Sequence, residues 1–163
     1  MAEQGPRRKG GVERVREAVA AAGLSAQVRE MPDSTRTAPE AAAAVGCDVA
    51  QIVKSLVFRG VRSGKPLLAL VSGRNRASEA KLEALFGEPL SRADADFVRE
   101  RTGFAVGGVP PLGHAEPLAT AIDRDLLAFP VVWAAAGSPR AVFDIAPADL
   151  VRVTGGRVAD LAA

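Results

Sequence analysis

The apolar residues of this chain recur at helical spacing in several segments, most of which end at a glycine. Val12, Val15 and Val19 are separated by three and four positions, with arginine and glutamate between them, and Gly23 follows. This spacing is typical of an amphipathic helix with one apolar face, and glycine frequently ends such a helix. The pattern predicts helices over residues 12–22, 37–46, 78–86, 93–101 and 147–153.

The segment Thr37-Ala-Pro-Glu40 has the form of a capping box. In such a box the Thr37 side chain accepts a hydrogen bond from the N–H of Glu40, and the Glu40 side chain accepts one from the N–H of Thr37. Pro39 suits the first turn of a helix because no hydrogen-bond donor is needed there. We therefore place the start of the second helix at Thr37, and we expect Asp48 to cap one further short turn.

Two other segments, 52–59 and 66–72, are rich in β-branched and apolar residues. The connection between them, Gly-Val-Arg-Ser-Gly-Lys, contains two glycines and predicts a hairpin. Because hairpins argue against a purely parallel sheet, we predict an α+β fold with a mixed, curved sheet. Further strands are predicted over residues 26–31, 118–123, 131–135 and 141–145.

Length and composition favour one soluble globular domain. A chain of 163 residues can bury a self-sufficient core, and we expect a single compact domain over residues 11–163. Aromatic residues make up only 4% of the chain, so alanine, valine and leucine must build the core. Cys47 is the single cysteine, which excludes an internal disulfide and, with only one histidine present, disfavours a structural zinc site.

The amino-terminal segment is charged and contains the run Arg7-Arg8-Lys9. We interpret residues 1–10 as a flexible basic tail, with a nucleic-acid-binding arm as the alternative. The segment lacks the apolar run of a signal peptide, and no part of the chain is apolar over the length of a bilayer. We therefore expect a cytoplasmic protein without a membrane partner. A net charge of +2 tolerates a polyanion without predicting one.

Lys54 is the first candidate for chemistry, because it interrupts the apolar run Gln-Ile-Val-Lys-Ser-Leu-Val-Phe. Strand alternation places Lys54 on one face with Ile52 and Leu56, and Ser55 on the other. A lysine among apolar neighbours either extends its ammonium group to water or points into a polar cleft. Asp144, which also lies between apolar residues, is a plausible ionic partner.

The loop Thr-Gly-Phe-Ala-Val-Gly-Gly-Val-Pro-Pro-Leu-Gly-His, residues 102–114, combines four glycines with two prolines. Glycine lets backbone N–H groups approach a ligand closely, and proline holds the neighbouring backbone rigid. Such a loop can stabilise an oxyanion or bind a carboxyl, ester or phosphate group. The alternative is a tight connection between a helix and a strand. His114, the single histidine, ends the loop.

Two familiar motifs are not matched. The segment 60–66 is one residue short of a phosphate-binding P-loop, and Pro66 replaces the serine or threonine that would hold magnesium. The chain contains no Gly-x-Ser-x-Gly elbow, so a hydrolase of that type has no support.

Taken together, these segments resemble the YbaK/prolyl-tRNA synthetase-associated domain family. The resemblance rests on Gln-Ile-Val-Lys54-Ser-Leu, the loop 102–114, Ala-Val-Phe-Asp144-Ile and Asp149-Leu, in matching order and spacing over about residues 11–163. It implies a barrel-like mixed sheet surrounded by helices. It also implies the activity of a free-standing editing deacylase, which hydrolyses a wrong amino acid from mischarged tRNA, mostly tRNA for proline.

The resemblance assigns roles to individual residues. Lys54 matches the family's essential lysine, and the segment from Gly107 and Gly108 to Pro111 matches its Gly-x-x-x-Pro loop beside the scissile ester. Asp144 matches an acidic position near the pocket. The implied reaction needs no metal, no cofactor and no protein nucleophile, because a water attacks the ester with help from the terminal ribose hydroxyl. We therefore expect Lys54, Gly107 and Gly108 to be catalytic.

Substrate binding is expected from Ser55, Pro111, His114 and Asp144, although His114 could instead support the pocket from outside. Relatives that remove cysteine carry threonine after the lysine, and those that remove alanine carry asparagine. Ser55 matches neither, so alanine, serine, cysteine and threonine all stay open. The expected partners are the acceptor end of mischarged tRNA and prolyl-tRNA synthetase. The alternatives are a non-catalytic RNA- or synthetase-binding module of the same fold and a hydrolase of small free esters.

Overall fold

The computed structural model describes residues 10–163, so nearly all of the expected basic tail lies outside it. The helices are α1 (Gly11–Ala21), α2 (Ala38–Val45), α3 (Glu79–Phe86), α4 (Ala95–Thr102) and α5 (Pro147–Thr154), with 3-10 turns η1 (Val49–Gln51) and η2 (Arg124–Ala128). The strands are β1 (Val28–Glu30), β2 (Ile52–Gly60), β3 (Pro66–Ser72), β4 (Leu90–Arg92), β5 (Ala119–Asp123), β6 (Val132–Ala135), β7 (Ala141–Ile145) and β8 (Arg157–Ala159).

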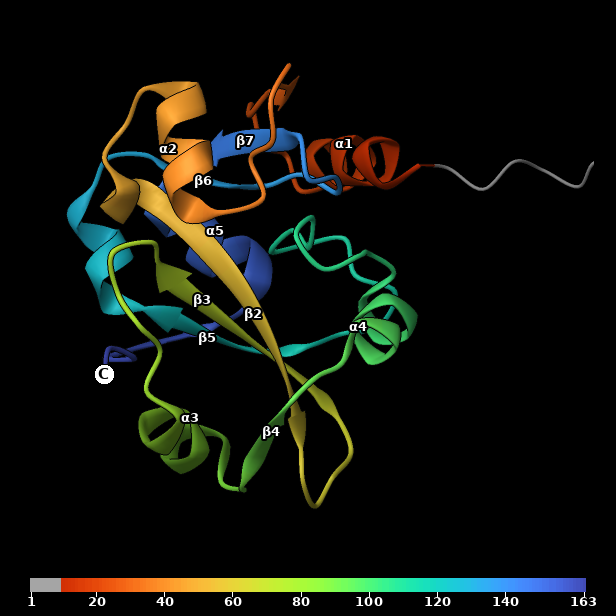
Figure 1. The fold of residues 1–163 in the computed structure, drawn as a ribbon, viewed down its shortest axis with the longest axis vertical. Helices are drawn as coiled ribbons and strands as arrows, with labels where there is room; N and C mark the ends of the chain where they lie inside the picture. Colours follow the sequence, from red (N-terminus) through yellow and green to blue (C-terminus); the bar gives the residue numbers. More distant parts are fainter. Residues whose placement is uncertain (1–9) are drawn as a thin grey trace, which may run out of the picture.

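The strands form one mixed sheet in the order β1-β7-β6-β2-β3-β5-β8, with β4 paired to the far end of β2 (Figure 1). The pair β2–β3 is antiparallel, as the hairpin predicted, while β2–β6 and β3–β5 are parallel. The predicted α+β fold with a mixed sheet is therefore confirmed. Within the described residues the sheet stays open, with β1 and β8 at its two ends.

Local sequence signals explain most of the helix boundaries. The capping box is present, since the Glu40 N–H donates to the Thr37 hydroxyl over 3.3 Å and the Thr37 N–H donates to the Glu40 carboxylate over 3.2 Å. Asp48 caps η1 by accepting from the Ala50 N–H at 2.8 Å. The strands β4 and β8 and the turn η2 were not predicted, because each is at most five residues long, which is too short to show a periodic pattern of apolar positions.

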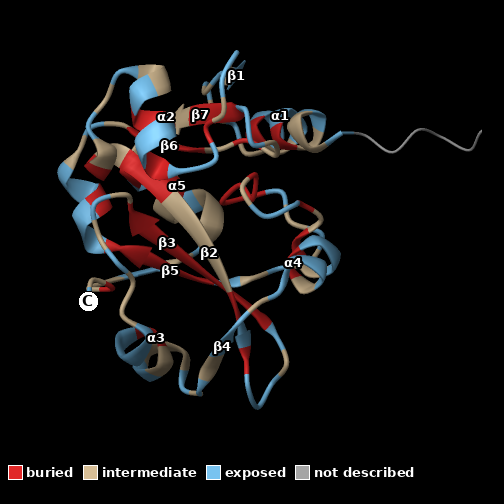
Figure 2. Ribbon diagram, in the orientation of Figure 1, coloured by how far each residue is buried: buried red, intermediate tan, exposed pale blue. Residues whose placement is uncertain are grey.

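The central strand β3 is buried along its whole length (Figure 2). On one face Leu68 and Leu70 pack in a cluster with Leu150 of α5. On the other face Ala69 packs in a cluster with Leu82 of α3. A strand covered on both faces reads as a continuous apolar run, which is the pattern of residues 66–72.

The neighbouring strand β2 differs: Ile52 and Val53 at one end and Phe58 and Gly60 at the other are buried, Arg59 is exposed, and residues 54–57 are only partly buried. Figure 2 shows this change of exposure along the strand that crosses the centre of the molecule. The strands that pair with β2 and the helices that cover it therefore leave one stretch of this strand incompletely buried. Among residues 10–163, none of the helices has the length and apolar character needed to cross a membrane.

Candidate active site

A gap in the sheet lies beside the middle of β2. On the edge away from β3, Ile52 and Val53 pair with β6, and the segment from Phe58 to Gly60 pairs with β4. Between these two pairings, no described strand covers residues 54–57 on that edge. The gap exists because β6 and β4 approach opposite ends of one long strand without meeting.

The ladder geometry indicates which backbone groups face the gap. Gly73 donates to the carbonyl of Ile52 over 2.7 Å, and Gly60 donates to the carbonyl of Lys65 over 2.9 Å. Hydrogen-bonded pairs alternate along an antiparallel ladder, so the even-numbered residues of β2 bond to β3. Ser55 and Val57 therefore direct their N–H and C=O groups toward the uncovered edge.

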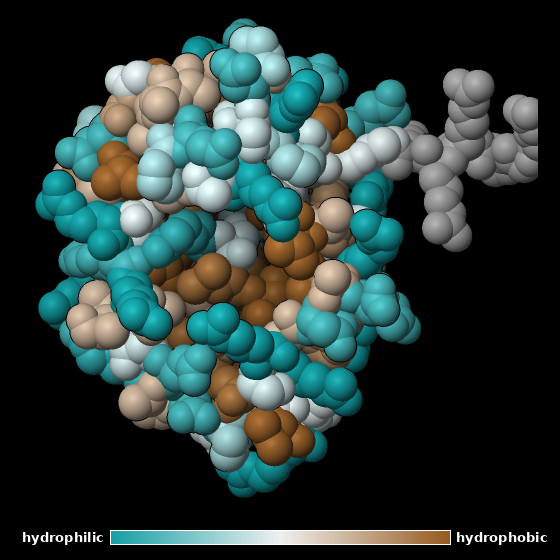
Figure 3. Space-filling model, viewed as in Figure 1, coloured by the Kyte–Doolittle hydropathy of each residue, from teal (hydrophilic) through white to brown (hydrophobic). Residues whose placement is uncertain are grey.

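A hollow of about 440 Å³ opens at this gap. The face of the molecule shown in Figure 3 is hollowed near its centre over β2, with apolar side chains inside and hydrophilic ones around them. The lining comes from α2 and the residues before it, from the start of β2, from β6 and from the glycine-proline loop; its polar members include Thr35, Arg36, Thr37, Lys54 and Ser55.

Lys54 is held at the border of this hollow by the backbone of the loop after β3. Its ammonium group donates to the carbonyl oxygen of Asn75. Partial burial lowers the pKa of Lys54, and the negative charge of Asp123 opposes that shift by favouring the ammonium form. The ionic partner considered from the sequence, Asp144, is therefore replaced by Asp123 as the carboxylate that acts on Lys54.

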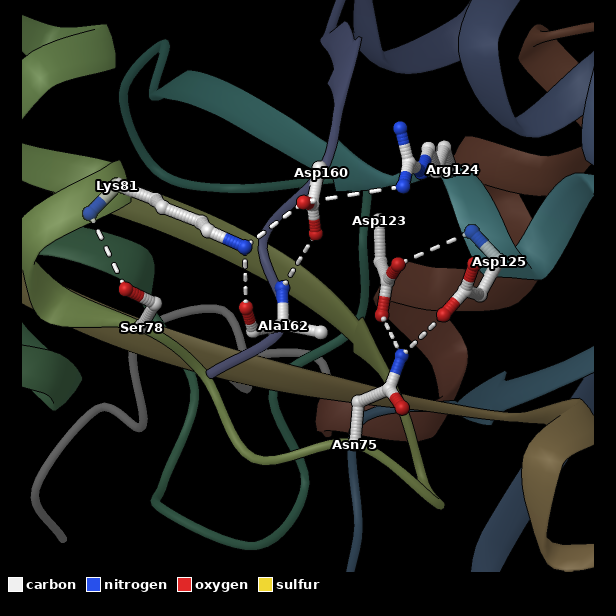
Figure 4. A network of polar contacts seen from close by, with 8 residues as sticks. All are labelled: Asn75, Ser78, Lys81, Asp123, Arg124, Asp125, Asp160 and Ala162. Atoms are coloured by element: carbon white, nitrogen blue, oxygen red, sulfur yellow. Dashed lines mark hydrogen bonds and ion pairs between the residues drawn. The ribbon is translucent and has the colours of Figure 1, made fainter.

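Asp123 fixes the loop that carries Asn75. This carboxylate is fully buried and accepts hydrogen bonds from the Ser72 N–H at 3.0 Å, the Asn75 side-chain amide at 2.9 Å and the Asp125 N–H at 3.0 Å. Figure 4 shows the Asn75 amide pointing between the carboxylates of Asp123 and Asp125. The Lys54 ammonium group is thus positioned by Asn75, whose side chain is in turn held by the buried carboxylate of Asp123.

Ser55 has the opposite environment. Its hydroxyl oxygen is buried, and it has no hydrogen-bond partner among the described residues. Its side chain lines the hollow, and its backbone groups face the uncovered edge of β2. Buried polar groups are normally paired, so an unpaired set around one residue is typical of a place where a ligand supplies the partners.

The glycine-proline loop contributes its first part to the hollow. Val106, Gly107 and Val109 line it, and Val106 keeps 46% of its surface exposed. Gly107 has a φ of +91°, in the left-handed region that favours glycine. An added Cβ there would lie 2.9 Å from the Arg36 side chain, so this position also needs glycine for space.

Gly108 contacts the β6–β7 turn and not the hollow. Its N–H donates to the carbonyl of Ala105 over 3.0 Å, and its carbonyl accepts from Gly137 over 2.9 Å. A Cβ at Gly108 would meet the backbone of Ser138 at 2.8 Å. Gly108 packs the loop against the β6–β7 turn and is not among the residues that line the hollow, so a larger residue there would disturb the fold as well as any reaction.

Pro111 and His114 lie outside the main hollow, in a separate one of about 330 Å³ beside the end of α5. The His114 Nε2–H donates to the carbonyl of Pro110 over 2.6 Å, and its ring meets that of Phe104 edge-on with centroids 6.5 Å apart. Burial lowers the pKa of His114, so the ring is neutral at neutral pH. These contacts join the end of the loop to earlier residues of the same loop, of which Phe104 is itself buried in the core.

Asp144 lies on β7 opposite Trp133 of β6. Trp133 lines the hollow. Val142, which precedes Asp144 by two positions and shares its face of the sheet, also lines it, but Asp144 itself does not. The structure thus brings together Lys54, Ser55 and Gly107 at the hollow, and it leaves Gly108, Pro111, His114 and Asp144 outside the lining.

Sequence reasoning missed Asn75 and Asp123. Asp123 ends the run Ala-Thr-Ala-Ile-Asp, and a lone acid beside apolar strand residues is the same signal that singled out Asp144. Asn75 carries no such signal: the predicted hairpin brings the loop after residue 72 close to the start of β2, but it does not indicate which group of that loop contacts Lys54. Arg36 was also missed, since it precedes a helix cap and resembles an ordinary exposed residue.

Known proteins match this chain over most of its length. A model of the aminoacyl-tRNA editing domain matches residues 32–153. The chain belongs to the aminoacyl-tRNA editing domain family. The matched region contains Lys54, Ser55 and the whole glycine-proline loop, so the resemblance found in the sequence is confirmed.

Three relatives illustrate the range of this family. A solved structure described as a "putative trans-editing enzyme for prolyl tRNA synthetase" has 51% identity and a TM-score of 0.89, covering 96% of this chain and 99% of that one. The uncharacterized protein YwhH of Bacillus subtilis (strain 168) is 30% identical over 131 residues, which is 80% of this chain and 83% of YwhH. The proline–tRNA ligase of Limosilactobacillus fermentum is 31% identical over 94 residues, 55% of this chain but 16% of the ligase. Sequences similar to this chain thus occur both in proteins of similar length and within a much longer ligase.

Proposed function

We propose that this protein is a trans-editing deacylase, which hydrolyses the ester between a small wrong amino acid and the terminal adenosine of mischarged tRNA. The observation that carries the proposal is the juxtaposition, at one hollow, of the Lys54 ammonium, the unpaired Ser55 groups and Gly107. Family membership and the trans-editing relative support the same activity. The preferred tRNA is proposed to be that for proline.

Lys54 is proposed to bind the oxygen atoms of the substrate. An ammonium group has three N–H donors, and one of these is used by the carbonyl of Asn75. The remaining donors can bind the ester carbonyl or a neighbouring negative oxygen. Because the ammonium group is partly desolvated, its attraction for developing negative charge is stronger than in bulk water.

The loop is proposed to face the ester from the other side. The N–H of Gly107 has no hydrogen-bond partner among the described residues, whereas that of Gly108 is already bonded to Ala105. Gly107 is therefore better suited than Gly108 to donate to the oxyanion. Gly108, Pro111 and His114 are proposed to hold the loop in place, and Asp144 to lie at the outer rim.

Ser55 is proposed to recognise the amino acid that is removed. Its hydroxyl, N–H and C=O groups offer both donors and acceptors, which suits the amino group or a small polar side chain of the substrate. Alanine, serine, cysteine and threonine are the candidate amino acids. Differences of one methylene are worth only about 1–3 kcal/mol in such a pocket, so a preference among them must be measured.

The reaction follows the course that the family implies. A water oxygen attacks the ester carbon, and a terminal ribose hydroxyl helps to accept and relay its proton. The bond between the carbonyl carbon and the other ribose oxygen then breaks, and that oxygen takes up the proton. The products are the free amino acid and tRNA with a free 3′ end. His114 does not line the hollow, which agrees with a mechanism without a histidine base.

The deciding experiment uses the purified full chain and tRNA for proline charged with alanine, serine, cysteine, threonine or, as a control, proline. Release of a small amino acid, with proline retained, is the expected result. Binding of mischarged tRNA without release would favour a non-catalytic module, and hydrolysis of small free esters alone would favour a simple esterase. Addition of prolyl-tRNA synthetase tests the proposed partner. We expect the protein to act in the cytoplasm, where charged tRNA is used.

A further inference from the structure

Lys54 also lines a second hollow, of about 310 Å³. This second hollow lies on the face of β2 that carries Leu56 and Phe58, and its other sides come from the residues before and at the start of α3 and from β4. In Figure 1, β2, α3 and β4 frame the lower part of the molecule. Because Lys54 belongs to both hollows, a ligand that reaches the first hollow past Lys54 can extend into the second.

Two arginines border the second hollow. Arg92 lies opposite Phe58 in the β2–β4 pairing, so both side chains share one face of the sheet, and Arg76 directly follows Asn75. Both arginines are exposed, and neither guanidinium group has a hydrogen bond or ion pair within residues 10–163. Glu79 is the acidic residue of the lining, so the second hollow carries an excess of positive charge.

Several other cations of the described residues have acidic partners within the protein. Lys81 and Arg124 both bind Asp160, at 2.7 and 3.7 Å, as Figure 4 shows. Arg101 binds Glu116 at 2.9 Å. Arg76 and Arg92 thus differ from these residues in that their charges remain available to an external anion.

The floor and the rim of the second hollow differ in chemistry. Leu56 and Phe58 form an apolar floor suited to a ribose or base, and guanidinium groups bind phosphate oxygens through paired N–H donors. Single-stranded nucleic acid is usually bound by this combination of a positive rim with an apolar or aromatic surface. A phosphodiester with its nucleoside therefore fits the second hollow better than a free amino acid does.

We propose that the second hollow binds the unpaired nucleotides that precede the terminal adenosine of the tRNA, with their phosphates on Arg76 and Arg92. This inference rests on the proposed function, which places the aminoacyl ester in the first hollow. Lys54 then lies where the two parts of the substrate meet. The arginines supply affinity for the nucleic acid and take no part in the hydrolysis itself.

The first test measures binding without any reaction. A fluorescent RNA hairpin that copies the acceptor stem, with its free single-stranded 3′ end, is titrated with the full chain and with Arg76→Gln, Arg92→Gln and the control Arg62→Gln. Arg62 lies in the β2–β3 turn, where it contacts the Gly87 carbonyl, and lines neither hollow. Each hollow variant should bind about tenfold more weakly, which corresponds to the loss of one charged hydrogen bond of about 1.4 kcal/mol.

Further measurements identify the contact. The slope of log affinity against log salt should fall by about 0.7 for each arginine removed, as for a phosphate of a single strand. Arg92→Lys should keep most of the affinity, and blunting the hairpin should remove the difference between wild type and variants. Equal binding by all variants, or no binding by wild type, would overturn the inference whether or not the protein is a deacylase.

The second test separates this inference from the proposed function. Hydrolysis of alanyl-tRNA and of alanyl-adenosine, which lacks the preceding phosphates, is measured under single-turnover conditions. Arg76→Gln and Arg92→Gln should raise the protein concentration needed for half-maximal rate with tRNA, and leave the saturating rate and the alanyl-adenosine rate unchanged. Equal losses on both substrates would refute a phosphate role. If wild type hydrolyses neither kind of substrate when it carries alanine, serine, cysteine or threonine, the proposed function fails, and the binding titration alone decides the second hollow.

Discussion

Asp123 and Ser55 both carry buried polar atoms close to Lys54. Asp123 binds the side chain of Asn75, whose carbonyl accepts from Lys54, and Ser55 follows Lys54 in β2. Asp123 is fully buried and accepts three hydrogen bonds from its neighbours. The hydroxyl of Ser55 is buried and has no partner among the described residues. Folding thus supplies Asp123 with hydrogen-bond partners, but within residues 10–163 it supplies none for the hydroxyl of Ser55.

The difference separates the two tasks of a binding site. A satisfied buried carboxylate stabilises the fold and fixes the loop that positions Lys54. An unsatisfied hydroxyl costs stability in the free protein, and a bound substrate can recover that cost. We therefore expect substitutions of Asp123 to act mainly on stability and substitutions of Ser55 to act mainly on activity.

The largest effect is expected for Asp123→Ala. This change leaves the Ser72 N–H, the Asn75 amide and the Asp125 N–H without their acceptor, and it should reduce the free energy of unfolding by about 3–5 kcal/mol. Urea titration followed by circular dichroism measures the change. Asp160→Asn serves as the control, because it removes the charge from the partly exposed ion pairs with Lys81 and Arg124 and keeps an oxygen that can accept from the Ala162 N–H, so it should cost less than about 1 kcal/mol. Equal effects of the two variants would contradict the structural role of Asp123.

Lys54 is positioned by the Asp123 network and is proposed to bind the substrate beside Ser55. Lys54→Ala should therefore reduce single-turnover deacylation by about 100-fold. Lys54→Arg should not restore the rate, because a planar guanidinium group directs its donors differently from an ammonium group. A variant that keeps more than about half of the wild-type rate would exclude Lys54 from the mechanism.

The stability of Lys54→Ala should be unchanged or slightly higher. The pKa of Lys54 is lower in the folded protein than in the unfolded chain, so the unfolded state binds the proton more readily. Stability therefore rises with pH between these two pKa values, and below them the ammonium group opposes folding. Thermal melting at neutral pH measures the outcome, and a marked loss of stability would show that Lys54 is needed for the fold.

Ser55→Ala tests whether Ser55 acts on activity and not on stability. It should slow hydrolysis of the preferred aminoacyl-tRNA about tenfold, as the loss of one substrate hydrogen bond would, and leave the melting temperature equal or slightly higher. Rates for alanyl-, seryl-, cysteinyl- and threonyl-tRNA should change by different factors, because Ser55 is proposed to contact the amino acid. A uniform loss for all four, together with a lower melting temperature, would indicate a packing role.

The smallest effect concerns His114. Burial lowers its pKa in the folded protein, so the unfolded chain binds a proton more readily. The stability that neutral His114 provides is present above pH 6.5 and is lost as the pH falls from there through the lowered pKa. The difference in melting temperature between wild type and His114→Gln should shrink by a few degrees from pH 7.5 to pH 5. If the difference in melting temperature between wild type and His114→Gln did not depend on pH, the His114 ring would be exposed to water and not buried.

Sequence patterns predicted the parts of this molecule that depend on neighbours in the chain. The capping box at Thr37, the hairpin of β2 and β3 and the unusual Lys54 all follow from local spacing. The strand β4, which is three residues long, exists because the far end of β2 offers it an edge. No local pattern of residues 90–92 could indicate this.

The candidate site was predicted in part for the same reason. Lys54, Ser55 and Gly107 were selected from the sequence and line one hollow, although their roles remain to be measured. The pairing of Asn75 with Asp123 joins residues 48 positions apart, so only the fold brings them together. The split of the loop between the hollow, at Gly107, and the body, at His114, likewise depends on how α1, α4 and the β6–β7 turn pack around it.

The interrupted edge of β2 also bears on how the protein behaves at high concentration. Uncovered strand edges are templates for pairing with strands of other molecules, which leads to aggregation. At the two ends of this sheet, β1 and β8 are only three residues long. The uncovered stretch of β2 spans four residues between β6 and β4, and its first two residues line the hollow that α2 and the glycine-proline loop border. A small ligand can enter there, but an extended strand of another molecule cannot align along it, so the fold exposes its free backbone groups without inviting self-assembly.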